Sequence, residues 1–375
     1  MKIGFIGNGR RSRIYWRVVR QLPEKFEFSG VLFRDPEKAA AFDKEHPGKA
    51  YTDIDTFLQQ DHDMIFLLLP REVVLSYVEK ILQAGFPLLI ETPPCNGPEE
   101  LNKIWELNEK YGARIQVAEQ YFLQPYHKAV RALTDNGVIG KISNLRISMA
   151  HDYHGISLMR RLLDAGDLPC TITASGYSFP VLDHFGRGNV QPGEEAIRED
   201  FRKVAAFSFD NGTTGFFDFG GSQYFNYFRS RHMSVQGTHG EINDYDVAYW
   251  NGKMPVYSRL LRQDLGKDNN LEGYFHRGIT WNGEFVYTSP FVPYREARLS
   301  DDEIAMGSVL LGMERMIATG EEVYPLKEAL QDTYLYLMMD EAIRTGQDVR
   351  TTPQPWQREG LEIANASFYN VMKLA

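Results

Sequence analysis

Residues 3–12 read IGFIGNGRRS, a short apolar run that turns into a glycine loop. Gly7 and Gly9 have the spacing of the dinucleotide-binding fingerprint. Ser12 stands at the position of its third glycine, where a small side chain preserves the packing of helix on strand. Gly7 would allow a tight turn, and Gly9 would let the backbone approach a pyrophosphate. A helix beginning near Arg10 would direct its free N–H groups at the phosphates. The stretch therefore predicts a strand, a phosphate-binding turn and a helix.

Apolar runs alternate with helical patterns through the next hundred residues. Further strands are expected at 28–33, 64–69, 87–90 and 114–118, with helical spacing between them. This alternation is typical of βαβ units, which build a parallel sheet.

The second half has the pattern of an antiparallel sheet. A strand is expected at 142–150. The runs 204–209 and 213–219 are joined through Asp210, Asn211 and Gly212. Because Asn-Gly accommodates the positive φ angles of a type I′ turn, this segment predicts a hairpin.

Helices are expected near the end of the chain. Ser300 and Glu303 form a capping box that opens one helix, and Gly320 is its stop signal. A second long helix is expected from about 326 to 345, and a short last helix at 361–373.

Composition excludes several classes of protein. The chain has 375 residues, of which 43% are hydrophobic and 24% charged, as in a globular protein with room for two domains. The net charge of −9 argues against a nucleic-acid partner and against an anionic membrane surface.

The two cysteines, Cys95 and Cys170, form no metal-binding pattern, so no metal site is expected. So few cysteines are consistent with a protein of a reducing compartment. No targeting segment is visible, and apolar runs such as 64–70 are far shorter than the ~18 residues that span a bilayer. We expect a cytoplasmic protein.

Five features follow one another along the chain: Gly7-x-Gly9, the segment 34–37, Leu69-Pro70, the segment 84–93 and the segment 136–140. In this order and spacing the chain resembles the glucose-fructose oxidoreductase, inositol dehydrogenase and MocA family. The likeness covers almost the whole chain.

The resemblance implies an α/β protein with two domains. Residues 1–120 would form a Rossmann NAD(P)-binding domain. Residues 121–375 would form an α/β domain with a large, mostly antiparallel open sheet that packs against another subunit in a homodimer or homotetramer. The helix at 361–373 would pack back on the first domain. A sugar, polyol or sugar derivative would lie between the domains, above the nicotinamide. The predicted cofactor-binding residues are Gly7, Asn8, Gly9, Arg10, Arg11, Ser12, Arg34, Leu69, Pro70, Glu91 and Thr92.

The catalytic positions depart from the family pattern. Family members commonly carry Glu-Lys-Pro, whose lysine polarises the reacting group, and this chain has Thr92 in place of the lysine. They also carry Asp-x-Gly-x-His in a helix, with the histidine as proton acceptor. The best match here, residues 174–178, has Ser178 in place of the histidine. An unassisted hydroxyl is far too weak a base for either task.

Other groups could take over proton transfer. His151, Tyr153 and His154 follow the first strand of the second half, with Arg160 and Arg161 shortly after. A histidine titrates near neutral pH, and a tyrosine could donate a proton to a carbonyl beside a cation. The alternative is that these histidines are structural and that the arginines complement a helix end. Predicted catalytic residues are His151, Tyr153 and His154. Predicted substrate-binding residues are Glu119, Tyr121, Arg160 and Ser178.

The choice between NAD and NADP depends on one position. An NAD-specific site places an acidic residue at the end of the second strand, where this chain has Phe33 followed by Arg34. Arg34 could clamp a 2′-phosphate, which favours NADP. The alternative is a packed Phe33, a solvated Arg34 and Asp35 as a helix cap.

Two functions from different classes remain open. One is an oxidoreductase that transfers hydride between a nicotinamide and a sugar-like alcohol, with a substitute acid-base group. The other is a nucleotide-binding sensor that kept the fold and lost catalysis, as the missing lysine and histidine would suggest. A minor third is cofactor-assisted elimination or hydrolysis of a glycoside.

Overall fold

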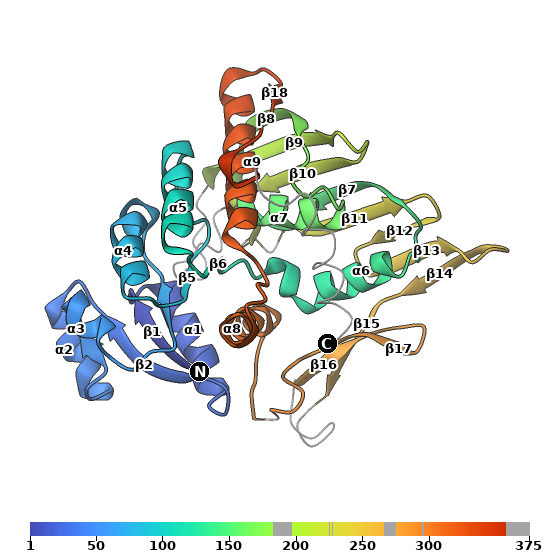
Figure 1. Cartoon of the computed structure of the whole chain (residues 1–375). Helices are drawn as coiled ribbons and strands as arrows, with labels where there is room; N and C mark the ends of the chain where they lie inside the picture. Colours follow the sequence, from blue (N-terminus) through green and yellow to red (C-terminus); the bar gives the residue numbers. More distant parts are fainter. Residues whose placement is uncertain (183–196, 225, 227, 266–274, 295, 358–375) are drawn as a thin grey trace.

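The computed structural model describes residues 1–182, 197–224, 226, 228–265, 275–294 and 296–357. Figure 1 shows an N-terminal sheet with helices around it and, beside it, a second and larger sheet that carries its own helices. This arrangement confirms the predicted fold class. The predicted helix at 361–373 lies outside the described residues.

The N-terminal sheet has six strands, all parallel, in the order β3-β2-β1-β4-β5-β6. The order reverses between β1 and β4, and the crevice outside the carboxyl ends of the strands at such a reversal is where α/β sheets bind ligands. The strands are β1 (Lys2–Ile6), β2 (Glu27–Leu32), β3 (Ala50–Tyr51), β4 (Met64–Leu67), β5 (Leu88–Ile90) and β6 (Ile115–Val117). The helices are α1 (Arg10–Gln21), α2 (Pro36–Glu45), α3 (Ile54–Leu58), α4 (Arg71–Gln83) and α5 (Pro98–Tyr111).

The central strands of this sheet are buried on both faces, as parallel strands between helix layers usually are. Phe5 and Phe66 pack with Tyr15 of α1 in one core cluster, whereas Ile65 lies in the other. The first cluster also contains Met313 and other apolar residues of α8 (Asp301–Thr319). A helix from late in the chain therefore completes the core of the N-terminal sheet.

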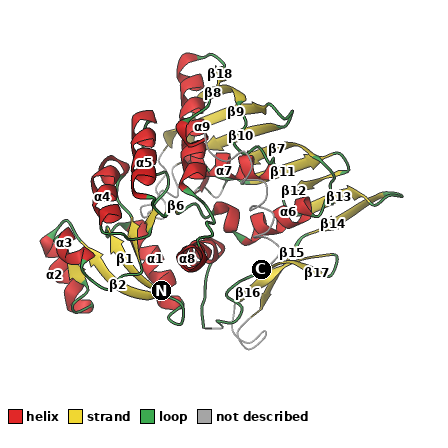
Figure 2. Cartoon of the chain, viewed as in Figure 1, coloured by secondary structure: helices red, strands yellow, loops and turns green. Residues whose placement is uncertain are grey.

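The second sheet has nine strands in the order β14-β13-β12-β11-β7-β10-β9-β8-β18. All neighbours are antiparallel except β7 and β10. Helices α7 (Asp152–Leu162) and α9 (Leu326–Thr345) pack on one face of this sheet (Figure 2). The strands are β7 (Ile142–Ser148), β8 (Cys170–Leu182), β9 (Ile197–Phe209), β10 (Thr214–Gly220), β11 (His232–Gly237), β12 (Gly240–Asn243), β13 (Asp246–Trp250), β14 (Pro255–Arg259) and β18 (Val349–Arg350).

The remaining described elements are a smaller sheet, further helices and short 3-10 turns. A separate three-stranded sheet contains β15 (Leu261–Leu265), β16 (Phe275–Trp281) and β17 (Glu284–Thr288). The other helices are α6 (Pro125–Asp135), α7 (Asp152–Leu162) and α9 (Leu326–Thr345), with short 3-10 turns η1 (Tyr121–Leu123), η2 (Gly221–Tyr224) and η3 (Pro355–Gln357). The predicted capping box of α8 is present, because Ser300 accepts from the amide of Glu303 and the Glu303 carboxylate accepts from the amide of Ser300. Within the described residues, no helix is both long and apolar enough to cross a membrane.

Two sequence predictions are wrong in detail. The β9–β10 hairpin exists, but Gly212 has a φ of 82° while Asn211 stays outside the positive region, so the turn is not type I′. The side chain of Asn211 instead accepts hydrogen bonds from the amide and hydroxyl of Thr213. These bonds stabilise a turn other than type I′. Residues 174–178 lie in strand β8. They are therefore not the helical Asp-x-Gly-x-His motif, and the prediction of Ser178 as a substrate-binding residue loses its basis.

Candidate functional site

The turn after β1 has a backbone that only glycine fits. Gly7 has a φ of 113°, and a Cβ at this position would lie 2.3 Å from the carbonyl oxygen of Leu68. The carbonyl belongs to the segment that follows β4, so the absence of a side chain lets the ends of β1 and β4 approach each other. The same Cβ would lie 3.2 Å from Cδ2 of Leu69, one of the predicted cofactor-binding residues. Pro70 follows it as the N-cap residue of α4.

Gly9, the next glycine of the turn, borders open space. Gly9 is the N-cap residue of α1, makes no side-chain cap, and a Cβ here would meet nothing within 4 Å. The first N–H groups of α1 thus face a space that no side chain of the turn fills, and such groups bind phosphate well. Ser12 is buried beneath the turn, as expected for the fingerprint's third small residue. The geometry fits a dinucleotide pyrophosphate.

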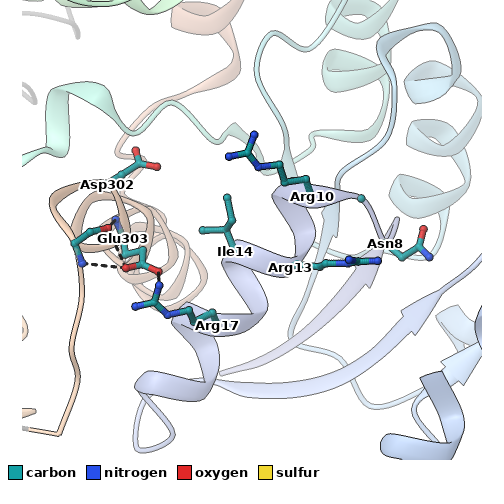
Figure 3. Close-up of a pocket in the computed structure, with 9 residues that line it drawn as sticks. Asn8, Arg10, Arg13, Ile14, Arg17, Asp302 and Glu303 are labelled. Atoms are coloured by element: carbon teal, nitrogen blue, oxygen red, sulfur yellow. Dashed lines mark hydrogen bonds and ion pairs between the residues drawn. The ribbon is translucent and has the colours of Figure 1, made fainter. Parts of the chain in front are cut away.

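A cavity of about 660 Å³ lies beside this turn, between α1 and the start of α8. Figure 3 shows Arg10 and Arg13 near its glycine end and Arg17 reaching Glu303, with which it forms a 2.7 Å ion pair. The lining residues are Asn8, Gly9, Arg10, Arg13, Ile14, Arg17, Ser300, Asp302 and Glu303.

Arg11 turns away from this cavity. Its guanidinium lies 3.2 Å from Glu91 Oε1 and 3.4 Å from Asp302 Oδ2, which ties the turn to the end of β5 and to the first turn of α8. Burial raises the pKa of Glu91 against the opposing effect of Arg11. Oε2 of Glu91 is buried and has no hydrogen-bond partner in the described part of the chain, whereas Oε1 also accepts from the Thr92 hydroxyl at 3.4 Å.

At the end of β2, Phe33 is packed, Arg34 is exposed and Asp35 caps a helix, as in the alternative to a phosphate clamp. Phe33 is 3% exposed and packs on Phe42, with ring centroids 5.2 Å apart. Asp35 caps α2 by accepting from the amides of Glu37 and Lys38. Arg34 is exposed between them, at the carboxyl edge of the sheet.

Glu119 and His154 meet where the two sheets adjoin. Glu119 comes two residues after β6 and is completely buried, and His154 lies in the first turn of α7. Nδ1 of His154 contacts Oε2 of Glu119, and Oε1 accepts from the amide of Tyr121 at 2.8 Å. Because an ionised carboxylate only accepts hydrogen bonds, Nδ1 is assigned as the protonated nitrogen and Nε2 as the acceptor. Within the described residues, Nε2 makes no hydrogen bond.

Aromatic side chains frame this pair. The ring of Tyr121 lies 4.4 Å from that of His154 between centroids, and its hydroxyl donates to the hydroxyl of Tyr224 at 2.9 Å. The same Tyr224 oxygen accepts from the amide of His151 at 3.0 Å. Burial raises the pKa of Tyr121 to about 12, so the phenol is neutral near pH 7. The structure thus brings together Glu119, Tyr121, His151 and His154.

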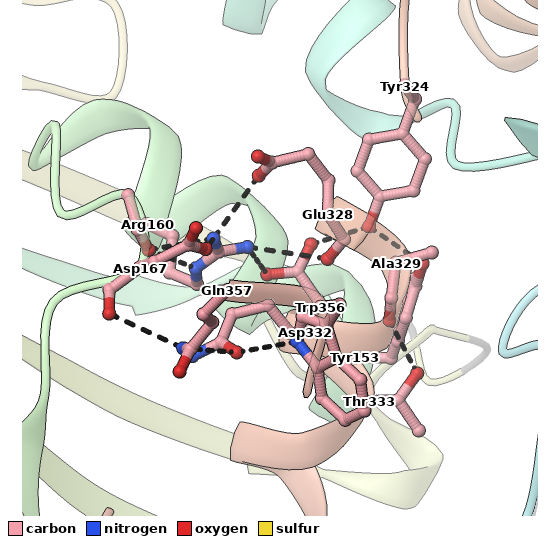
Figure 4. Close-up of polar contacts among 12 residues, drawn as sticks. Tyr153, Arg160, Asp167, Tyr324, Glu328, Ala329, Asp332, Thr333, Trp356 and Gln357 are labelled. Carbon is pink, nitrogen blue, oxygen red and sulfur yellow. Dashed lines mark hydrogen bonds and ion pairs between the residues drawn. The ribbon is translucent and has the colours of Figure 1, made fainter. Parts of the chain in front are cut away.

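Tyr153 and Arg160 lie in a different cluster, on another side of α7 (Figure 4). The Tyr153 hydroxyl is 2.7 Å from that of Tyr324, which donates to Asp332 Oδ2 at 2.5 Å. Arg160 is 2% exposed and pairs with Asp332 at 2.6 Å and Glu328 at 3.2 Å. Both side chains belong to this buried network, so the structure does not support Tyr153 as a catalytic residue or Arg160 as a substrate-binding residue. Ser178 is exposed near the end of β8.

Sequence reasoning missed two contributors. Tyr224 is not among the predicted site residues, and nothing in its surroundings in the sequence indicates the hydrogen bond to Tyr121. His127 was not considered, yet it lies beneath the site and its Nδ1 is 2.6 Å from the carbonyl oxygen of Tyr121. Burial lowers the pKa of His127 to about 4.

Comparison with known proteins identifies the class of the N-terminal domain. Residues 1–119 match the model of the glucose-fructose oxidoreductase, inositol dehydrogenase and MocA family, described as an oxidoreductase family with an NAD-binding Rossmann fold. The match is confined to the part of the chain that forms the six-stranded parallel sheet.

Curated relatives match over part of their length. The putative oxidoreductase YteT of Bacillus subtilis is 25% identical over 167 residues, which cover 41% of this chain and 39% of that protein. Inositol 2-dehydrogenase of Corynebacterium glutamicum is 26% identical over 149 residues, covering 39% of this chain and 44% of that protein. The chain thus spans about two fifths of the length of these relatives.

Solved structures share the whole fold. An oxidoreductase from Agrobacterium radiobacter, in complex with NAD+, L-tartaric acid and magnesium, superimposes with a TM-score of 0.66 at 15% identity, covering 93% of this chain and 98% of that one. Apo scyllo-inositol dehydrogenase from Lactobacillus casei gives 0.62 at 18% identity, with the same coverage of both chains. At these identities the likeness concerns the fold.

Proposed function

We propose that this protein is an NAD(P)-dependent oxidoreductase that transfers hydride between the nicotinamide and a secondary alcohol of a polyol, sugar or sugar derivative. The observation that carries the proposal is the contact of His154 Nδ1 with the buried carboxylate of Glu119 at the carboxyl edge of the Rossmann sheet. Similarity to an inositol dehydrogenase supports a polyol as the substrate class.

The pair has the chemistry of a general base. With Nδ1–H donating to Glu119, Nε2 of His154 can take the proton from the substrate hydroxyl while the carbon loses hydride. The carboxylate then stabilises the imidazolium that forms, and its second oxygen stays fixed by the Tyr121 amide. A bound nicotinamide would supply the hydride acceptor, or the donor in the reverse direction. This arrangement needs no lysine at position 92 for the proton transfer itself.

The cofactor would lie across the turn of Gly7 and Gly9, with its pyrophosphate on the N-terminus of α1. Asn8 and Arg10 line the adjoining cavity, and Leu69, Pro70, Glu91 and Thr92 follow the ends of β4 and β5. We propose that Arg34, which is exposed at the end of β2, binds the 2′-phosphate and favours NADP.

The second sheet has a face for another copy of the chain, as we propose for a homodimer or homotetramer. Alternate residues on the face opposite α7 and α9 include exposed Tyr177, Val204, Phe216 and Tyr257. Exposed large apolar side chains on one face of a sheet are consistent with an interaction surface, and we infer that this face has that role. Light scattering on the purified protein tests this, and a monomer would contradict it. We also retain the domain division at residue 120 and a cytoplasmic location as proposals.

The test of function is turnover. Purified protein is incubated with NAD+ and with NADP+ against inositols, other polyols, sugars and sugar acids while the absorbance of the reduced nicotinamide is followed. We expect turnover with at least one alcohol, and a loss of about 100-fold or more in His154→Gln with cofactor binding retained. Thr92→Ala is the matched variant at the family's lysine position and should keep most of kcat at saturating cofactor, whatever its effect on cofactor affinity.

The second candidate is a nucleotide-binding sensor without catalysis, which the threonine at position 92 favours. Tight cofactor binding with no turnover of any alcohol in the panel would support the sensor and contradict the oxidoreductase.

A further inference from the structure

Lys203 joins three elements behind the His154–Glu119 pair. It lies in β9 on the same face as buried Ala205 and Phe207. Its ammonium is 3.0 Å from Asp152 at the start of α7 and 2.6 Å from Asp340 in α9. It also lies 5.2 Å from the ring centroid of Tyr336, one helical turn before Asp340. A single side chain thus links the second sheet to both helices that cover it.

The partner on α7 has an unusual backbone. Asp152 has a φ of 28°, in a positive region that non-glycine residues seldom enter, although aspartate does so more often than most. Such residues gather at functional sites, where the neighbouring structure holds the conformation. The Asp152 side chain forms an ion pair with Lys203, with 17% of the lysine side chain and 27% of the aspartate side chain exposed.

The charges of this group are consistent with a persistent ion pair. Burial alone would lower the pKa of Lys203, but the carboxylates of Asp152 and Asp340 outweigh it and raise that pKa. Burial also raises the pKa of Asp152, and Lys203 opposes this shift. The lysine is therefore an ammonium ion near neutral pH.

Asp152 lies in the turn that carries both histidines of the site. The amides of His154 and Gly155 both donate to the carbonyl oxygen of His151, at 3.0 and 3.2 Å. The amide of His151 is held by Tyr224 on one side, and the carboxylate of Asp152 by Lys203 on the other. Gly155 packs so closely on β10 that a Cβ there would lie 2.6 Å from the Phe217 ring. The direction of the His154 ring follows from how this turn is anchored.

We propose that Lys203 is a positioning residue: through Asp152 it holds the first turn of α7 in its strained conformation and so keeps the His154 imidazole against Glu119. The catalytic consequence rests on the proposed function, whereas the anchoring of the turn does not. A misplacement of about 1 Å at a catalytic group can cost about 100-fold in rate, so a tether of this kind has a measurable effect.

The experiment compares Lys203→Met, Lys203→Arg and Asp152→Asn with the wild-type chain. Lys110→Met is the matched control, because Lys110 also forms an ion pair, to Glu79 at 2.8 Å, and lies 4.7 Å from a tyrosine ring, but in α5. Hydrogen exchange of the His154 and Gly155 amides reports the turn without any need for turnover. Steady-state kinetics with an alcohol from the panel reports its effect on the reaction.

We expect exchange at these two amides to become at least about fivefold faster in Lys203→Met and in Asp152→Asn, and to stay near wild type in Lys110→Met. kcat should fall about tenfold or more in the same two variants with the KM for cofactor unchanged, and Lys203→Arg should recover most of both properties. Unchanged exchange in Lys203→Met and Asp152→Asn would overturn the proposal. So would a kcat loss in Lys203→Met that Asp152→Asn lacks, because the lysine would then act directly on the substrate. Should Lys203→Met fail to fold, Asp152→Asn alone decides by the same two readouts. A wild-type chain that turns over no alcohol contradicts the proposed function and leaves the exchange result to judge the tether.

Discussion

The two glycines of the first turn should respond in opposite ways to the same substitution. Gly7→Ala places a Cβ 2.3 Å from the Leu68 carbonyl oxygen in a backbone with a φ of 113°. Positive-φ strain of about 1–3 kcal/mol and overpacking of about 1–3 kcal/mol predict a stability loss of about 2–6 kcal/mol. Gly9→Ala adds a Cβ that meets nothing within 4 Å at a φ of −70°, so its cost should stay near the ~1 kcal/mol of a poor N-cap.

Cofactor binding should reverse this order of effects. The Cβ of Gly9→Ala would occupy the space that the pyrophosphate needs, and we expect cofactor affinity to fall by at least about tenfold, or 1.4 kcal/mol. Unfolding is followed by thermal denaturation, and binding by titration of reduced-nicotinamide fluorescence. Gly48→Ala is the control for backbone strain alone, because Gly48 has a φ of 73° with nothing within 4 Å. Wild-type affinity in Gly9→Ala, or wild-type stability in Gly7→Ala, would refute the description of this turn.

Three further predictions concern single side chains. The folded-state pKa of His127 is about 4, below its ordinary value near 6.5. The folded protein should therefore lose up to about 3 kcal/mol of stability through this group as pH falls from about 6.5 to 4. Urea unfolding of His127→Asn should show a smaller loss of stability over the same pH range. Arg160→Met leaves Asp332 buried without its cation and should lower stability by about 3–5 kcal/mol in the same assay, with little change in cofactor affinity; a loss below about 1 kcal/mol would contradict the network. Arg34→Ala should weaken NADP binding much more than NAD binding, and equal losses measured by fluorescence titration would contradict the phosphate clamp.

Local patterns in the sequence predicted most of the fold. Gly7, Gly9 and the alternating apolar runs describe one βα unit after another, and each such unit is stabilised by contacts close in sequence. The hairpin at 210–212 was found for the same reason, although its turn type depends on a hydrogen bond from Thr213 that propensity does not report. Fitting residues 174–178 to a helical motif failed because the segment pairs with β9 along its whole length.

The site could be predicted only in part, because its contacts are long-range. Glu119 and His154 are 35 residues apart, and both were singled out since each follows a predicted strand. Tyr153 adjoins His154 in the sequence but points to another side of α7, as consecutive residues of a helix do. The sequence predicts Arg160 as a substrate-binding residue because nothing near it in the chain shows its carboxylate partners. These partners, Glu328 and Asp332, lie in a helix more than 160 residues away.

The central claim is that Glu119 and His154 act as one unit in proton transfer. The most direct measurement is a double-mutant cycle on kcat with Glu119→Gln, His154→Gln and the double variant, using an alcohol that the wild-type protein oxidises and cofactor affinity as the check on binding. Each single variant should lose about 100-fold or more in kcat, and the double variant should lose about as much as the worse single one. Losses that multiply in the double variant, or a Glu119→Gln variant with wild-type kcat, would contradict the account.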